Sequence, residues 1–424
     1  MKRKIMDKNF TYMLKLKEGW SKLMNLITPE EEPTDPLSLS LKNFTLHYKD
    51  PKKAILKDID NIKSCKLPDY ERDFVWLFFL GIIPFKHPMN WQKILTSERA
   101  NYVTLKKKYM TKDIEDFVKL KREKDTYKYD EYKKILKKEE FDLLNLIKVD
   151  VDRTYQEKEI FTKEETKQKL TWVLYLYAKE NPQYGYKQGM NDLLGVFLYV
   201  LYKNYFYKDD FCENDIKCVY AIVHSNNYFI EHDLYLLFSK FMNKGISEFF
   251  LYNTEKYQNG FLGRTSLKEK MNLQIKQILT CNDSELKKRV YILYYKRFKV
   301  IDPDFYKLLV EKVEPELFLT RWYLCIFTRE FKLEEIVYLW DLIIMYEFVE
   351  KKLYANKKVL WHYNVMDYIA LSMLINCKPD VSNKKEDIND LMASIMHYPD
   401  NIPLEKIAKK AIDIYLQINP DIDI

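Results

Sequence analysis

Residues Lys187 to Tyr205 read KQGMNDLLGVFLYVLYKNY, and their apolar side chains recur at the spacing of one helix face. The stripe consists of Met190, Leu193, Leu194, Phe197 and Val200. Side chains spaced three and four residues apart lie on the same side of an α-helix, where they can face a core. The stretch therefore predicts a buried helix.

Other stretches on both sides show similar apolar spacing. We expect helices over 71–80, 91–110, 141–153, 170–177, 215–224 and 231–243, the first ended by Gly81 and Pro84. No stretch alternates with a period of two for long enough to require a strand. The chain has only 8 Gly and 14 Pro in 424 residues, which disfavours folds rich in tight hairpins. The predicted fold class is all-α.

Composition narrows the class of function. Hydrophobic residues make up 47% of the chain and aromatic residues 15%, enough for a large core. The 70 Lys and Arg are interspersed with 63 Asp and Glu, so the net charge of +7 forms no concentrated basic stripe and nucleic-acid binding is not expected. Six cysteines without a CxxC pair predict reduced thiols.

The less regular segments suggest how the chain is organised. Residues 1–66 are expected to form a partly helical N-terminal extension, with a short helix near 11–26. Two insertions are expected, one near 106–140 as charged surface helices and one at 244–300 with a helix near 266–279. Residues 376–424 are expected to form C-terminal helices, with a polar loop at 378–390 before a last pair of short helices.

No membrane-spanning segment is expected. The longest apolar run, 74–84, is too short to cross a bilayer, and the first ten residues are followed by no apolar stretch. We expect a protein that is cytoplasmic or peripheral to a membrane.

Several common catalytic motifs are missing from the sequence. It contains no GxxxxGK[ST], GxGxxG, HExxH or GxSxG, so nucleotide binding by those routes is not expected. The six histidines are scattered, and we expect neither a metal site nor a cofactor.

Two groups of polar residues are candidates for chemistry. Ile147, Asp150 and Arg153 are spaced three apart, so on a helix the Asp150 carboxylate could orient the Arg153 guanidinium. Such pairs are common on helix surfaces and contribute only a few tenths of a kcal/mol, so a purely structural role stays open.

The second group lies in NPQYGYKQGMND, residues 181–192. Asn181, Pro182 and Gly185 predict a turn, after which Tyr186 and Gln188 open the next helix. Gln is not a favoured N-cap residue, so its place beside glycines suggests a role other than capping. Packing of a loop explains the same residues equally well.

Taken together, these motifs resemble the TBC domains that activate Rab-type small GTPases. That family carries RxxxW, IxxDxxR and YxQ in this order, and the chain has Arg72 to Trp76, Ile147-Asp150-Arg153 and Tyr186-Gln188. Further agreement extends over 67–375 and includes Asn181-Pro182, Arg321-Trp322, Arg329-Glu330-Phe331 and Trp340-Asp341. Gln156 departs from the family, where Pro is usual after the Arg-Thr pair. The stretch EHDLYLLFSKFM is closer to the branch that acts in endosomal and autophagic trafficking.

The resemblance implies an all-α domain of two helical halves over 67–375, and a mechanism. Arg153 would stabilise charge on the phosphate and Gln188 would orient the attacking water, as the two catalytic fingers. Asp150 would hold Arg153, and Tyr186 would set the backbone at the helix start. Ile147 and Gly189 would support the two motifs, while Arg72 and Trp76 would brace the catalytic helices.

The implied partner is a Rab-family GTPase in its GTP form, and Mg²⁺ and GTP would belong to that partner. The chain alone would neither bind nor hydrolyse nucleotide. Membrane-associated adaptors and a location peripheral to endomembranes are also implied. The alternative is a non-catalytic Rab-binding scaffold in membrane trafficking. Loss of Arg153 or Gln188 would favour that alternative, and both residues are present.

Overall fold

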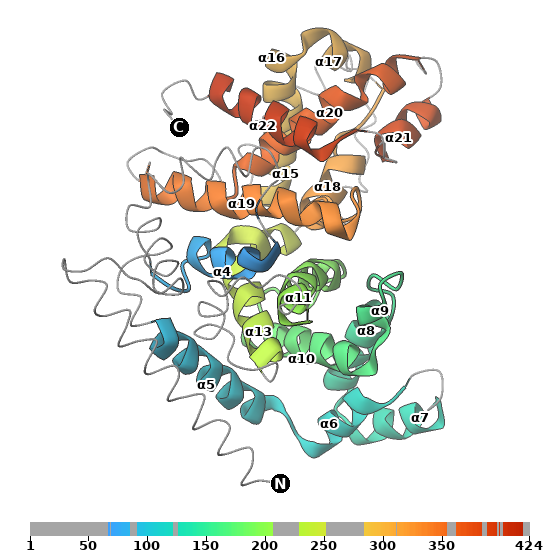
Figure 1. Ribbon diagram of the computed structural model, residues 1–424. Helices are drawn as coiled ribbons and strands as arrows, with labels where there is room; N and C mark the ends of the chain where they lie inside the picture. The colour runs from blue at the N-terminus through green and yellow to red at the C-terminus, as the bar shows by residue number, and fades with distance from the viewer. Residues whose placement is uncertain are drawn as a thin grey trace, which may run out of the picture.

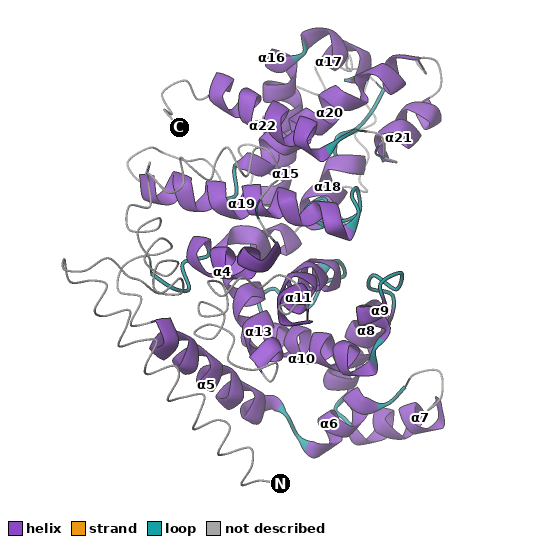
Figure 2. Ribbon diagram, in the orientation of Figure 1, coloured by secondary structure: helices purple, strands orange, loops and turns teal. Residues whose placement is uncertain are grey.

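The computed structural model describes residues 67, 69–84, 91–121, 126–206, 229–251, 284–310, 312–353, 362–383, 388–396, 398 and 402–418. Within these ranges the chain forms helices joined by turns and contains no strand (Figure 2). The all-α prediction is confirmed. The helices expected near 11–26, 215–224 and 266–279 lie outside the described residues.

The N-terminal half consists of a series of helices that runs as far as residue 251. They are α4 (Asp69–Phe79), α5 (Trp91–Tyr109), α6 (Lys112–Lys119), α7 (Thr126–Ile135), α8 (Lys138–Asp152), α9 (Glu159–Thr162), α10 (Glu164–Glu180), α11 (Met190–Phe206) and α13 (Ile230–Phe241). A π-helical turn, η3 (Met242–Ile246), and a 3₁₀ turn, η4 (Ser247–Leu251), follow α13 directly.

The C-terminal half begins at residue 285. It contains α15 (Glu285–Tyr291), η6 (Ile292–Phe298), α16 (Lys299–Ile301), α17 (Pro303–Leu309), α18 (Glu316–Leu324), α19 (Leu333–Leu353), α20 (Val365–Asn383), α21 (Ile388–Met396) and α22 (Leu404–Ile418). In Figure 1, α5 to α13 lie below and α15 to α22 above, with α4 and α19 between them. Helix α4 packs on both α11 and α19, so the first described helix joins the two halves.

Aromatic side chains fill the junction between the halves. Trp76 of α4 lies edge-on to Phe197 of α11 at 5.4 Å between ring centroids. Phe241 of α13 stacks on Trp340 of α19 at 5.0 Å. Large rings in such arrangements bury much apolar area and add to it the attraction between their edges and faces. This cluster therefore fixes how the four helices pack.

Two segments that we expected at the surface contribute to the core. In the charged stretch 106–140, Ile114, Phe117 and Val118 of α6 are buried. Their spacing of three and four residues makes α6 amphipathic, a pattern that the surrounding charges had obscured. In 244–300, the described segment after 284 buries Leu286 and Val290 completely, so this part is not a surface insertion.

The C-terminal region also differs from expectation. Helix α20 runs to Asn383, so the polar loop expected from residue 378 does not begin there. The earlier turns of α20 are buried at Ile369 and Leu371, and the same helix continues into the polar sequence. Helix α22 has 15 residues and is not short. Among the described cysteines, Cys325 and Cys377 are buried.

Candidate functional site

Arg153 lies at the C-terminal end of α8, where the helix stops. Ile147 and Asp150 are buried on α8, and Arg153 is the residue that caps it, with φ −104° and ψ 1°. The Arg153 side chain is 53% exposed, whereas that of Asp150 is 1% exposed. Nη2 of Arg153 donates to Oδ1 of Asp150, so a buried carboxylate holds an exposed guanidinium. The spacing of three residues had suggested this pair.

Gln188 lies in a turn before α11 and not in the helix. The structure starts α11 at Met190, so the prediction that Gln188 opens the helix is wrong. Gly185 and Gly189 have φ of +61° and +103°, a region that favours glycine, and they hold the turn outside helical geometry. The Gln188 side chain is exposed, and its amide forms no hydrogen bond with any described residue. It is therefore available to a partner.

Tyr186 and Asn191 connect the turn to the end of α8. The Tyr186 hydroxyl donates to Oδ2 of Asp150 at 2.8 Å. Nδ2 of Asn191 donates to Oγ1 of Thr154 at 2.9 Å, and Oδ1 of Asn191 accepts from the Gly189 amide at 3.1 Å. The backbone on both sides of Gln188 is thus tied to the segment that carries Arg153. Burial, and then the Asp150 carboxylate, raise the pKa of Tyr186, so its hydroxyl stays a proton donor.

A cavity of about 240 Å³ lies beside Arg153. Its lining also includes Tyr155, Glu157, Asn191, Asp192, Thr328 and Arg329. Arg329 comes from the turn between α18 and α19, and its Nε and Nη2 donate to Oδ2 of Asp192 at 3.1 and 3.0 Å. The cavity is therefore built by both halves and contains two guanidinium groups.

Sequence reasoning singled out neither Asn191, Asp192 nor Thr154 as a site residue. Asn191 and Asp192 directly follow the second motif, and Thr154 follows the first. Buried polar residues are normally hydrogen-bonded, so the Asn that directly follows the second motif was a usable signal. The contact between Asp192 and Arg329 had no local signal, because 137 positions separate the two residues.

Arg72 and Trp76 do not line this cavity. Both are buried on α4 and bind Asp341 of α19: Nε of Arg72 donates to both carboxylate oxygens at 3.0 Å, and the Trp76 indole donates to Oδ1 at 2.8 Å. Nη2 of Arg72 donates to the carbonyl of Leu67 at 3.0 Å. The first motif thus connects α4 to α19 at a distance from the other two motifs.

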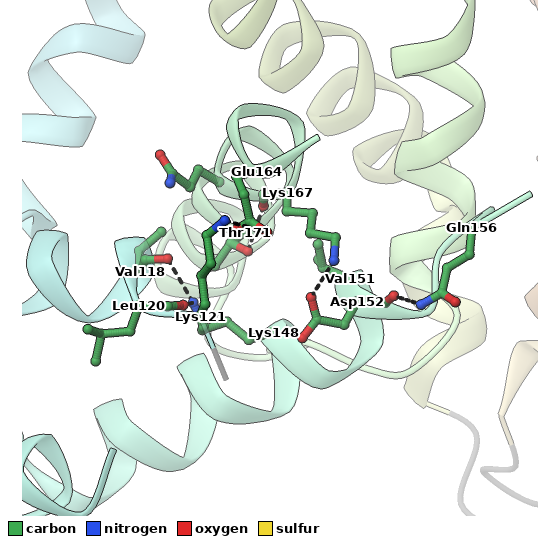
Figure 3. A pocket seen from close by; sticks show the side chains of 11 residues that line it. Val118, Leu120, Lys121, Lys148, Val151, Asp152, Gln156, Glu164, Lys167 and Thr171 are labelled. Carbon is green, nitrogen blue, oxygen red and sulfur yellow. Dashed lines mark hydrogen bonds and ion pairs between the residues drawn. The ribbon is translucent and has the colours of Figure 1, made fainter. Parts of the chain in front are cut away.

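A second cavity, of about 190 Å³, lies between α6, α8 and α10. Figure 3 shows its polar side chains pairing with one another. Nζ of Lys148 donates to the carbonyls of Val118 and Leu120 at 2.7 and 2.8 Å, and Nζ of Lys167 bonds Asp152 at 3.0 Å. Lys148 therefore satisfies carbonyls at the end of α6, and the lysine charges are used within the protein. No group of three His, Cys, Asp or Glu within the described ranges is placed to hold a metal ion.

Comparison with known proteins decides the family. A family model described as the Rab-GTPase-TBC domain matches residues 69–270 and 265–380. The chain belongs to this family. The matched ranges of the TBC domain include all three motifs and the turn that carries Arg329.

Individual relatives agree with this assignment. TBC1 domain family member 5 of Homo sapiens is 26% identical over 270 residues, which are 61% of this chain and 30% of that protein. The Mus musculus protein of the same name is 23% identical over 346 residues, 77% of this chain and 38% of that protein. The TBC chain therefore spans only 30% to 38% of the length of these relatives.

A solved structure supports the fold. The crystal structure of the Ypt/Rab-GAP domain of Gyp1p superposes with a TM-score of 0.58 at 17% identity, covering 92% of this chain and all of that one. In the described part of the TBC chain, no helix is both long and apolar enough to cross a membrane.

Proposed function

We propose that this TBC domain accelerates GTP hydrolysis by a Rab-type small GTPase, with Arg153 and Gln188 as its two catalytic residues. The observation that carries the proposal is the contrast at Arg153, an exposed guanidinium held by the buried carboxylate of Asp150. A guanidinium that is half exposed gains little stability from one ion pair. Its geometry instead presents a fixed cation to a partner.

Arg153 suits the charge that develops during hydrolysis. Negative charge grows on the γ-phosphoryl group and on the oxygen that bridges it to the β-phosphate. A planar guanidinium can donate to two phosphate oxygens at once and is always charged. Asp150 binds Nη2 of Arg153, and no other hydrogen bond of this side chain is formed within the described residues. The remaining donors are free to bind phosphate.

Gln188 suits the second task, which is to orient the attacking water. A Gln amide can accept a hydrogen bond from water and donate one to phosphate. Tyr186 and Gly189, on either side of Gln188, are hydrogen-bonded to the network around Asp150 and Asn191. This network supports a common placement of the two residues, because its hydrogen bonds join the turn to the end of α8.

The proposed partner is a Rab in its GTP form, which brings its own nucleotide and Mg²⁺. We further propose a location at the cytoplasmic side of endomembranes, reached through membrane-associated adaptors. Similarity to TBC1 domain family member 5 supports placing the protein in the endosomal and autophagic branch of the family.

A panel of GTP-loaded Rab proteins, assayed for phosphate release, tests the proposal. Arg153→Ala and Gln188→Ala should each lower stimulated hydrolysis by about 10²-fold or more. An arginine supplied in trans contributes roughly 10³ to 10⁵ in rate, and without Gln188 the attacking water is no longer oriented. Lys307→Ala is the matched control, since it removes an exposed cation paired with Asp304 on α17. Tight binding of a GTP-loaded Rab without faster release would support a non-catalytic scaffold instead.

A further inference from the structure

Arg329 is held in place by a backbone that is costly to form. It follows Ile326 and Phe327, which have φ of +44° and +62° and are completely buried. Left-handed backbone at residues other than glycine costs about 1 to 3 kcal/mol each and persists only where the surroundings enforce it. Here the Trp340 indole donates to the carbonyl of Ile326 at 3.2 Å, and the Phe327 amide donates to the Trp322 carbonyl at 3.0 Å.

The side chain of Arg329 neutralises Asp192. Both of its hydrogen bonds go to Oδ2 of Asp192, while Oδ1 accepts from Nδ2 of Asn191 at 2.8 Å. Burial raises the pKa of Asp192, and the charges of Arg329 and Arg153 oppose this rise. The positive charge of Arg153 therefore already acts on the Asp192 carboxylate, in a cavity that all three side chains line.

Arg153 is thus within the field of two carboxylates. Asp150 holds it by a hydrogen bond, and Asp192 attracts it but is occupied by Arg329. Without Arg329, a largely buried carboxylate would lack its cation. A buried charge left without its partner is strongly unfavourable, so pairing it with another cation is stabilising. The half-exposed side chain of Arg153 is the other guanidinium that lines this cavity.

We propose that Arg329 is a positioning residue that occupies Asp192 and thereby keeps Arg153 directed at the partner's phosphate. This inference rests on the proposed function, in which Arg153 is the catalytic cation. By pairing with Asp192, Arg329 prevents that carboxylate from competing with the partner's phosphate for the Arg153 guanidinium. It contacts neither the nucleotide nor the reacting atoms.

If Asp192 competes for Arg153, removing Asp192 should compensate for the loss of Arg329, whereas it should not if Arg329 contacts the GTPase directly. Arg329→Gln should lower the maximal single-turnover rate of a saturated GTP-loaded Rab about three- to fivefold, as expected if Arg153 is diverted into an ion pair at the upper end of ordinary strength. Asp192→Asn in the same chain should restore most of that rate, because the competing charge is gone. Arg329→Lys, which keeps the charge, should stay within about twofold of the unmodified protein.

The outcomes separate the possible failures. An unchanged rate in Arg329→Gln overturns the inference. A lower rate that Asp192→Asn fails to restore also overturns it, and would indicate that Arg329 contacts the GTPase itself. Thermal unfolding of each variant shows whether the turn still folds, and the double variant supplies the test if the single one is unstable. If Arg153→Ala retains full stimulation, the proposed function fails as well. If Arg153→Ala loses stimulation while Arg329→Gln keeps it, only this inference fails.

Discussion

The hydroxyl of Tyr186 donates to Oδ2 of Asp150 across 36 positions of sequence, while Oδ1 of the same carboxylate accepts from Arg153. One buried carboxylate therefore joins the turn before α11 to the exposed guanidinium at the end of α8. Displacing either partner disturbs the other.

Tyr186→Phe removes one of these two bonds and keeps the ring. Oδ2 of Asp150 would then be buried without a donor, which costs about 1 to 3 kcal/mol. We expect the free energy of unfolding in urea to fall by that amount. Stimulated GTP hydrolysis should fall less than in Arg153→Ala, since the guanidinium remains. An unchanged free energy of unfolding would show that the bond is replaced by another donor.

Asp341→Ala should be among the most damaging single changes in the core. Arg72 and Asp341 are both almost completely buried, so the change leaves a guanidinium without its carboxylate. Breaking a buried ion pair from one side costs about 3 to 5 kcal/mol. Asp304→Ala is the control, because the Asp304 side chain is 89% exposed and pairs loosely with Lys307. Equal unfolding midpoints for the two variants would contradict this role for Asp341.

Gly195→Ala should destabilise the protein although it lies within a helix. A Cβ at this position would meet Cε2 of Tyr155 at 2.6 Å, closer than real atoms approach. Overpacking costs about 1 to 3 kcal/mol, which exceeds the gain of up to about 1 kcal/mol from replacing Gly by Ala in a helix. In a Tyr155→Ala background the same change should become neutral or stabilising, as unfolding of the four proteins would show. A loss that is independent of Tyr155 would refute the clash.

Glu350 should make stability depend on pH. Burial raises the pKa of Glu350 to about 7, and its Oε2 has no hydrogen-bond partner among the described residues. Because the folded-state pKa lies above that of the unfolded chain, the folded state binds the proton more tightly, and stability falls as pH rises from about 4.5 to about 7.

Glu350→Gln removes that titration while it keeps the size of the side chain. The variant should gain about 2 to 3 kcal/mol relative to the unmodified protein between pH 5 and pH 8, measured by urea unfolding. Glu405→Gln, at an exposed position of α22, is the matched control. The same stability difference at both pH values would exclude a titrating Glu350.

Local sequence patterns predicted the structural features that depend on residues close together in the chain. The apolar stripes predicted the helical class, and the spacing of Asp150 and Arg153 suggested the ion pair that α8 forms. The turn at Gln188 was only partly predictable. Gly185 was recognised as a turn residue, but the φ of +103° at Gly189, which delays the helix to Met190, depends on the hydrogen bond from its amide to Asn191.

Contacts between the halves could not be predicted in this way. Asp192 meets Arg329, and Trp76 meets Asp341, only because α11, α4 and α19 pack together. No periodicity in one segment encodes a partner more than a hundred residues away. Helix α6 is a different case, because its apolar spacing is present in the sequence and was obscured by the surrounding charges.

The contacts between α4 and α19 determine whether fragments of the domain can fold. A fragment that ends after α13 would contain Arg72 and Trp76 without Asp341, and would expose the rings that now stack on Trp340. We therefore expect that the N-terminal half does not fold on its own. Limited proteolysis between the halves should consequently yield nicked protein that stays associated, not separate stable fragments.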